Sequence, residues 1–163
     1  GKIATEPASC CGRWLNKTKH FMTEQERAEK VVQHMMDNDA FSQWLGINIE
    51  SVKPGYCKLG LSIREEMTNG FKVSHGGIAF SLADSALAFA SNSYGRIALA
   101  IENNITYTSK VETGDRLTAE TEEIKCGERI ATYIVSITNE QNKKVATFRG
   151  SVFRTLKHHL KTQ

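Results

Sequence analysis

The sequence has no apolar run as long as the roughly 20 residues that a membrane-spanning helix requires. It also has no segment in which a charged start and an apolar stretch precede a small-residue cleavage site, which is the pattern of a secretory signal. The formal net charge is only +3, and basic residues gather only in short runs at Lys17–His20 and Lys157–Lys161. Because a nucleic-acid-binding face normally needs a sustained basic stripe, we expect contact with neither membrane nor nucleic acid.

Cysteine is scarce and shows no ligand spacing. None of the four cysteines belongs to a Cys-x-x-Cys pair or has the histidine spacing of a zinc site. The neighbours Cys10 and Cys11 cannot form an ordinary unstrained disulfide with each other. Cys57 and Cys126 fall in strand-like segments, where a free thiol behaves as a small hydrophobic group. We therefore expect no metal site and a reducing, cytoplasmic setting.

Length and composition are those of one globular domain, with 163 residues, of which 40% are hydrophobic and 24% are charged. Residues 1–21 lack apolar periodicity, so we expect them to be an expression-derived or flexible extension. A genuine amino-terminal arm is the open alternative. The folded domain is expected to cover residues 22–156, and a basic carboxy-terminal tail residues 157–163.

Apolar periodicity and turn residues predict the order of helices and strands. Thr23 followed by Glu26 is a capping-box pattern, which predicts a helix of about four turns. A hairpin is expected around Pro54-Gly55, and an apolar helix of about 16 to 18 residues after His75. Beyond this helix, period-two patterning predicts four strands joined by short turns, as in an antiparallel meander. Their expected ranges are 97–108, 116–125, 129–139 and 144–154.

The long apolar helix has almost no polar side between Gly76 and Gly95, so a sheet must cover it. Its many alanine and serine residues make it slim, which lets strands approach its backbone closely. The sequence therefore predicts an α+β fold in which an antiparallel sheet wraps around one central helix, with an additional amino-terminal helix.

Asp84 is the only acidic or basic residue between His75 and Arg96. Burying a carboxylate without partners costs several kcal/mol, and this far into a helix the dipole no longer helps it. One interpretation is structural: Asp84 meets an exposed strip or pairs with a basic residue such as Arg149. The other is functional: it lines a cleft, where partial desolvation makes a carboxylate a better base or nucleophile.

Gly76 and Gly77 begin the same helix, where backbone N–H groups are unpaired and unobstructed by side chains. An acyl carbonyl placed there would have its developing negative charge stabilised, an effect worth roughly 3 to 4 kcal/mol per donor. Paired glycines also occur at purely structural loop-to-helix junctions. His75 is by itself ambiguous, since a histidine before a helix is more often a cap or a satisfied core group than a base. We therefore assign it no proton transfer.

These residues stand at a specific spacing, with an asparagine six residues before the histidine and an aspartate nine residues after it. Over residues 22–154 the chain resembles the phenylacetate-degradation (PaaI-type) branch of the hotdog-fold thioesterases. The residues that carry the resemblance are Asn69, His75, Gly76, Gly77 and Asp84, with Phe148-Arg149-Gly150 near the end.

The resemblance implies a hotdog fold, a homodimer or homotetramer with active sites at the dimer interface, and no metal or organic cofactor. It implies that Asp84 of one subunit attacks the thioester or activates water, while the Gly76 N–H of the other subunit polarises the carbonyl. Asn69 would orient the water or the acyl carbonyl, and His75 would help to shape the loop.

The strand after the helix departs from the family pattern. Some relatives carry there a hydroxyl that holds water, and this sequence places Ala100 at that position. The nearby residues Asn103, Asn104 and Thr106 are polar, and the pattern leaves open which of them face the cleft.

The leading prediction is hydrolysis of an acyl-CoA to the free acid and CoA, with phenylacetyl-CoA or a ring-hydroxylated relative as the expected substrate. The aryl preference rests on the resemblance, because Phe71, Phe80, Phe89 and Tyr94 are equally explained as packing residues. One alternative is a hotdog dehydratase or hydratase, whose chemistry needs a histidine and an acid facing the same carbon. A non-catalytic acyl-CoA sensor is the other.

Overall fold

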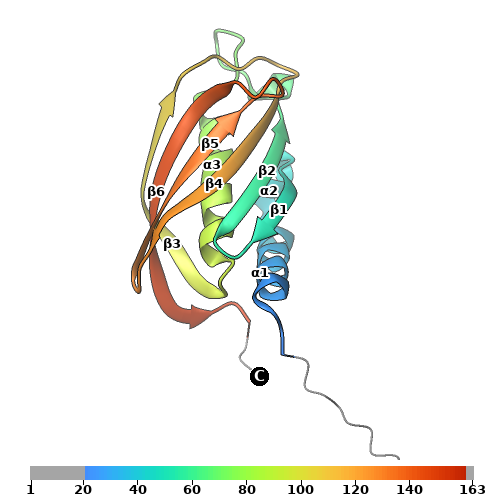
Figure 1. Cartoon of the computed structure of the whole chain (residues 1–163). Helices are drawn as coiled ribbons and strands as arrows, with labels where there is room; N and C mark the ends of the chain where they lie inside the picture. Colours follow the sequence, from blue (N-terminus) through green and yellow to red (C-terminus); the bar gives the residue numbers. More distant parts are fainter. Residues whose placement is uncertain (1–20, 161–163) are drawn as a thin grey trace, which may run out of the picture.

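A six-stranded antiparallel sheet curves around one long helix, α3 (Figure 1). The structure, a computed structural model, describes residues 21–160. The predicted α+β class, with a wrapped central helix and an additional amino-terminal helix, is confirmed. In chain order the elements are α1 (Glu24–Asn38), α2 (Ala40–Leu45), β1 (Asn48–Lys53), β2 (Tyr56–Ser62), the 3-10 helix η1 (Glu65–Met67), α3 (Gly76–Asn92), β3 (Arg96–Tyr107), β4 (Arg116–Cys126), β5 (Ile130–Thr138) and β6 (Lys144–His158).

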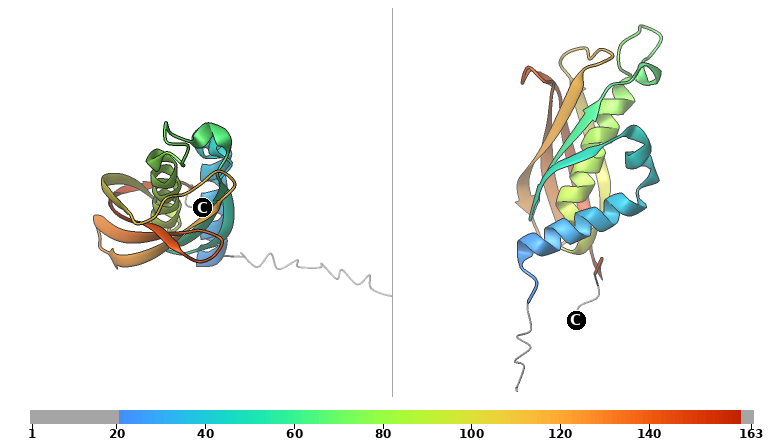
Figure 2. Two further views of the ribbon diagram at one scale, coloured as in Figure 1. Left: turned by 90° about the horizontal axis from the view of Figure 1, so that it is seen from above. Right: turned by 90° about the vertical axis from the view of Figure 1, so that its right-hand side faces the viewer.

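Helix α1 begins at the predicted capping box. The Thr23 hydroxyl accepts a hydrogen bond from the Glu26 N–H, and the Glu26 carboxylate accepts one from the Thr23 N–H, at 3.1 and 2.8 Å. The helix packs against β1 and α3, and Figure 2 shows it crossing beside them. Helix α2 was not predicted, because six residues are too few to show helical periodicity. It is capped by Asp39 and ends at Gly46, whose φ is 81°.

The strand order is β1-β2-β4-β5-β6-β3. The predicted hairpin forms from β1 and β2, and β4, β5 and β6 form the predicted meander. The expected meander connection between β3 and β4 is wrong: β3 pairs with β6 at the sheet edge, and β4 pairs with β2. The connection at 108–115 instead runs past the start of α3, where Val111 C=O accepts a hydrogen bond from Ser74 N–H at 2.8 Å.

Small residues let the sheet approach α3 closely. On the sheet side, Gly150 of β6 leaves the necessary room, because a Cβ there would overlap the Leu87 side chain and lie 2.8 Å from Asn103 Oδ1. The helix contributes alanines that are at most 5% exposed: Ala79, Ala83, Ala86 and Ala90. This close packing places α3 within reach of side chains on β3.

Strand β6 runs past its predicted end at Arg154 as far as His158. His159 then donates its backbone N–H to Gly95 C=O at 2.9 Å, and its Nε2 lies 2.6 Å from Asn92 Oδ1. The first part of the expected basic tail therefore belongs to the fold, while residues 161–163 and 1–20 lie outside the described residues. No helix among residues 21–160 is long and apolar enough to cross a membrane.

Candidate active site

Asp84 lies in the middle of α3 and is half-buried. Its Oδ1 accepts a hydrogen bond of 2.7 Å from Nδ2 of Asn103 on β3. The suggested ion pair with Arg149 is wrong, because Arg149 lies with Glu102 in an exposed pair whose charged atoms are 3.9 Å apart. The carboxylate is therefore held by one neutral donor and lacks a counter-ion among the described residues.

Two effects act in opposite directions on the Asp84 carboxyl group. Burial raises its pKa above the usual value for aspartate, and the hydrogen bond from Asn103 lowers the pKa in part. A raised pKa makes the ionised carboxylate a stronger base than an exposed aspartate. A partly buried carboxylate with a raised pKa is what the functional interpretation of the sequence predicts for Asp84.

Asn103 is the residue of the site that the sequence did not single out. It faces α3, whereas Asn104 next to it is exposed. Strict alternation did not reveal this, because a β-bulge between Ala100 and Glu102 shifts the register of β3 against β6. Ala100 itself is exposed. The direction of the Asn103 side chain could have been inferred only from its pairing with Gly150 across β3 and β6, and this pairing is not visible before the fold is known.

The start of α3 presents a free backbone donor at Gly76. His75 is the N-cap: its Nδ1 accepts from the Gly77 N–H and its carbonyl from the Ile78 N–H, both at 2.9 Å. Within residues 21–160 the Gly76 N–H has no hydrogen-bond partner. Tyr107 donates its hydroxyl to the Gly76 carbonyl at 2.7 Å, which fixes this turn. Because Nδ1 of His75 accepts a hydrogen bond, the histidine acts as a cap here.

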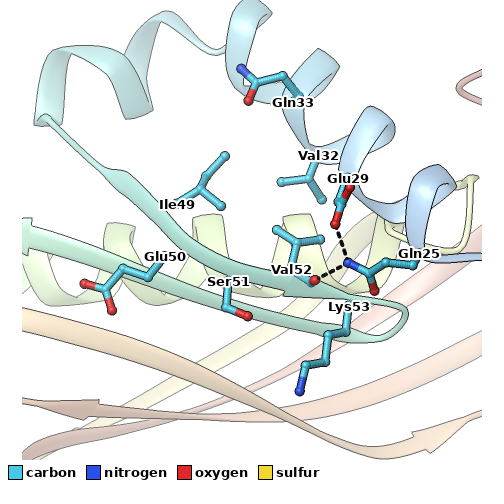
Figure 3. Close-up of a pocket in the computed structure, with 9 residues that line it drawn as sticks. All are labelled: Gln25, Glu29, Val32, Gln33, Ile49, Glu50, Ser51, Val52 and Lys53. Atoms are coloured by element: carbon cyan, nitrogen blue, oxygen red, sulfur yellow. Dashed lines mark hydrogen bonds between the residues drawn. The ribbon is translucent and has the colours of Figure 1, made fainter.

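A cavity of about 400 Å³ opens beside this helix start. Its lining is mostly apolar, with His75, Tyr107 and Lys110 as the larger polar groups. A larger cavity, of about 520 Å³, lies between α1 and β1 (Figure 3). None of the predicted site residues lines it. In it the Gln25 amide bridges Glu29 and the Val52 carbonyl, at 2.6 and 2.8 Å. Volume alone therefore does not locate the site.

Asn69 belongs to the loop that leads into α3. Its Oδ1 accepts the Phe71 N–H at 2.9 Å, and the loop is closed by a bridge between Thr68 and Ser74. Asn69, His75 and Gly76 thus lie at one end of α3. Asp84 follows Gly76 by eight residues, a rise of about 12 Å along a helix. A single chain does not bring all four predicted residues together.

The aromatic residues considered for an aryl pocket have mostly structural contacts. Phe89 is 1% exposed. Phe80 packs edge-on against Phe148, with ring centroids 5.4 Å apart, and the Tyr94 hydroxyl donates to Glu123 at 2.9 Å. Phe71 is different, since it is 89% exposed. Phe71 is therefore the most exposed of the four, while Phe80 and Tyr94 are partly buried.

Comparison with known proteins identifies the family. Residues 71–146 match the thioesterase superfamily, a span that contains His75, Gly76 and Asp84. The chain is 39% identical to acyl-coenzyme A thioesterase PaaI of Escherichia coli over 74% of this chain and 86% of that protein. This protein belongs to the hotdog-fold thioesterase superfamily.

A solved structure and one further relative agree with this assignment. The structure of the E. coli PaaI protein from the phenylacetic acid degradation operon superimposes with a TM-score of 0.81, at 35% identity, over 83% of this chain and 99% of that one. Human acyl-coenzyme A thioesterase 13 is 29% identical over 76% of this chain and 89% of its own length. The resemblance noted in the sequence is therefore confirmed, and the wrapped helix α3 is the central helix of the hotdog fold.

Proposed function

We propose that this hotdog protein is an acyl-CoA thioesterase, which hydrolyses an acyl-CoA to the free acid and CoA. The observation that supports this most directly is the half-buried Asp84 carboxylate, which has a raised pKa and no counter-ion among the described residues. The free Gly76 N–H at the start of the same helix supplies the second element that thioester chemistry needs. Two of the relatives are named acyl-coenzyme A thioesterases, which supports the same reaction.

In the proposed reaction the Gly76 N–H of one subunit donates to the thioester carbonyl oxygen, where negative charge develops. One such donor is worth roughly 3 to 4 kcal/mol of transition-state stabilisation. Asp84 of the other subunit either attacks the carbonyl carbon, forming an anhydride that water then hydrolyses, or removes a proton from the attacking water. The carbon–sulfur bond breaks, the water oxygen ends in the carboxylic acid, and the sulfur leaves as the CoA thiol. Asn69 orients the water or the carbonyl, and His75 holds the helix start in shape.

The proposed site needs two subunits, and β3 is the surface through which we expect them to meet. It is an edge strand, so one side of its backbone is unpaired within the chain. Leu99 and Ile101 on this strand are 60% and 57% exposed. Antiparallel pairing of two such edges would cover these side chains in a homodimer, and two dimers would form the expected homotetramer.

The substrate we propose is phenylacetyl-CoA or a ring-hydroxylated relative, on the basis of the similarity to PaaI. We propose that the ring of Phe71, which is 89% exposed in the loop before α3, contacts such an acyl group. The proposed hydrolysis uses side chains, a backbone N–H and water alone, and so needs no metal or organic cofactor. The free thiols of Cys57 and Cys126 accord with the proposed cytoplasmic setting.

The test is release of free thiol from a panel of acyl-CoA thioesters by the purified protein. Phenylacetyl-CoA, its hydroxylated forms, straight-chain acyl-CoAs and an enoyl-CoA form the panel. Hydrolysis with the highest kcat/KM on the aryl thioesters is expected. Addition of water to the enoyl-CoA without thiol release would identify a hydratase instead, and tight binding without turnover would identify a sensor.

A further inference from the structure

Asn103 is held against α3 by the shape of the sheet. It stands opposite Gly150 in the pairing of β3 with β6, and the missing side chain at Gly150 leaves the room that its amide occupies. A Cβ at position 150 would lie 2.8 Å from Asn103 Oδ1 and would overlap the Leu87 side chain. The amide is therefore confined to one place beside the helix.

The amide of Asn103 leaves one of its own polar atoms unsatisfied. Its Oδ1 is buried and has no hydrogen-bond partner among the described residues. An unsatisfied buried acceptor is costly, and such groups in folded proteins are few and call for an explanation. Turning the amide over would not relieve the cost, because Oδ1 would then face the Asp84 carboxylate. The orientation observed is the one that favours a charged Asp84.

The hydrogen bond to Asp84 divides the two carboxylate oxygens by role. Nδ2 of Asn103 donates to Oδ1 of Asp84 at 2.7 Å, and Oδ2 of Asp84 has no hydrogen-bond partner within residues 21–160. One oxygen is thus anchored and the other is left for a water molecule or a carbonyl carbon. No other polar side chain of the described chain donates to this carboxylate.

We propose that Asn103 is a positioning residue, which orients the Asp84 carboxylate so that Oδ2 faces the thioester or the attacking water. This inference rests on the proposed thioesterase function. Asn103 would also favour the ionised form of Asp84 and so offset part of the effect of burial. Charged groups of the described chain do not shift the pKa of Asp84. Glu102, which precedes Asn103, and Arg149, which precedes Gly150, form an exposed ion pair with each other.

The deciding variant is Asn103→Leu, which keeps the side-chain size and removes the donor. We expect kcat to fall roughly 10- to 100-fold with KM nearly unchanged, because a hydrogen bond to a charged group acts on the reacting carboxylate. The acid limb of the pH–rate profile should move to higher pH. Asn48→Leu, at an exposed asparagine of β1 on the opposite edge of the sheet from β3, is the matched control and should retain the wild-type profile.

Asn103→Asp tests the same contact with the shape of the side chain preserved. Two carboxylates within hydrogen-bond distance cannot both ionise freely, so activity should be low at neutral pH and recover as the pH rises. This variant also decides the matter if Asn103→Leu does not fold. Wild-type kcat and an unmoved acid limb in a folded Asn103 variant would overturn the proposal.

A carboxyl carbon-13 NMR titration separates this proposal from the proposed function. In Asn103→Leu the Asp84 signal should titrate at higher pH than in the wild-type protein, whether or not a substrate is turned over. An unchanged midpoint would overturn the role of Asn103. A shifted midpoint in a protein that hydrolyses none of the thioesters would leave the contact established and would refute the thioesterase function.

Discussion

Asp84 has an unusual position for a charged residue, because it sits in the middle of a helix that is otherwise packed with alanine and leucine. We expect Asp84→Asn to lower thioester hydrolysis at least about a hundredfold, since an amide of the same shape can neither attack a carbonyl nor activate water. Circular dichroism should show an unchanged fold. Near wild-type turnover by the folded variant would contradict the assignment of Asp84 as the reactive carboxylate.

The raised pKa of Asp84 has opposite consequences for activity and for stability. Activity needs the ionised form, so it should be lost as the pH falls through the raised pKa. Stability behaves differently, because the folded state binds the proton of Asp84 more tightly than the unfolded state does. The buried charge therefore lowers the free energy of unfolding at pH values above the folded-state pKa. This destabilisation is relieved as the pH falls through that pKa.

Urea unfolding of Asp84→Asn measures this stability effect directly. The variant should be as stable as the wild-type protein or more stable at neutral pH, and this difference should shrink as the pH is lowered through the pKa of Asp84. A variant that is markedly less stable at neutral pH would mean that the charge contributes favourably to the fold.

The start of α3 combines a structural loop with the proposed oxyanion donor. Gly76→Val should lower turnover steeply, because a side chain there would block the approach of a carbonyl to the N–H, and even its Cβ would lie 3.0 Å from the Tyr107 ring.

Asn69→Ala should lower thioester hydrolysis roughly 10- to 100-fold, through kcat more than through KM.

Asn69→Asp is the control for the loop. It keeps an oxygen that can accept the Phe71 N–H, and it removes the amide donor. If the amide of Asn69 acts on the thioester or on water, this variant should lose turnover as Asn69→Ala does. A rise in KM alone in the Asn69→Ala variant would identify a binding residue, and the shared transition-state role would be wrong.

Elements whose signals are local were predictable from the sequence. The capping box at Thr23, the turn at Gly55 and the apolar run from Gly76 to Asn92 each fix a boundary through neighbouring residues. The placement of β3 at the sheet edge was not predictable in this way. Because α3 lies between β2 and β3 in the chain, the residues of the β3–β4 connection do not reveal which strands pair in the sheet. The pairing of β4 with β2 joins strands on either side of α3 in the sequence.

In the candidate site, too, local features were predictable from the sequence and contacts that depend on the fold were not. Asp84 and Gly76 could be proposed because a charge in an apolar helix and a glycine pair at its start are visible in the sequence. Asn103 could not be assigned, because its direction depends on the bulge in β3 and on the space above Gly150. A contact between residues 19 positions apart on two elements becomes visible only when the sheet has closed around the helix.

The whole protein is expected to work as a dimer joined through β3. Replacing both Leu99 and Ile101 with aspartate would place four like charges at the shared edge, so sedimentation velocity should show a monomer with little activity. Ile124→Asp, on the interior strand β4, changes a residue that is 51% exposed and should leave the dimer intact. A fully active monomer would exclude a site built from two subunits.

Mixing two inactive variants tests the shared site most directly. In a heterodimer of Asp84→Asn with Gly76→Val, one of the two sites would combine an intact Asp84 from one chain with an intact Gly76 from the other. Random reassortment makes half of the dimers mixed, so about a quarter of the wild-type activity should return when the variants are unfolded and refolded together. Each variant refolded alone should stay inactive. Were Asp84 and Gly76 to act within one chain, every site in the mixture would retain a defect, and no activity would return.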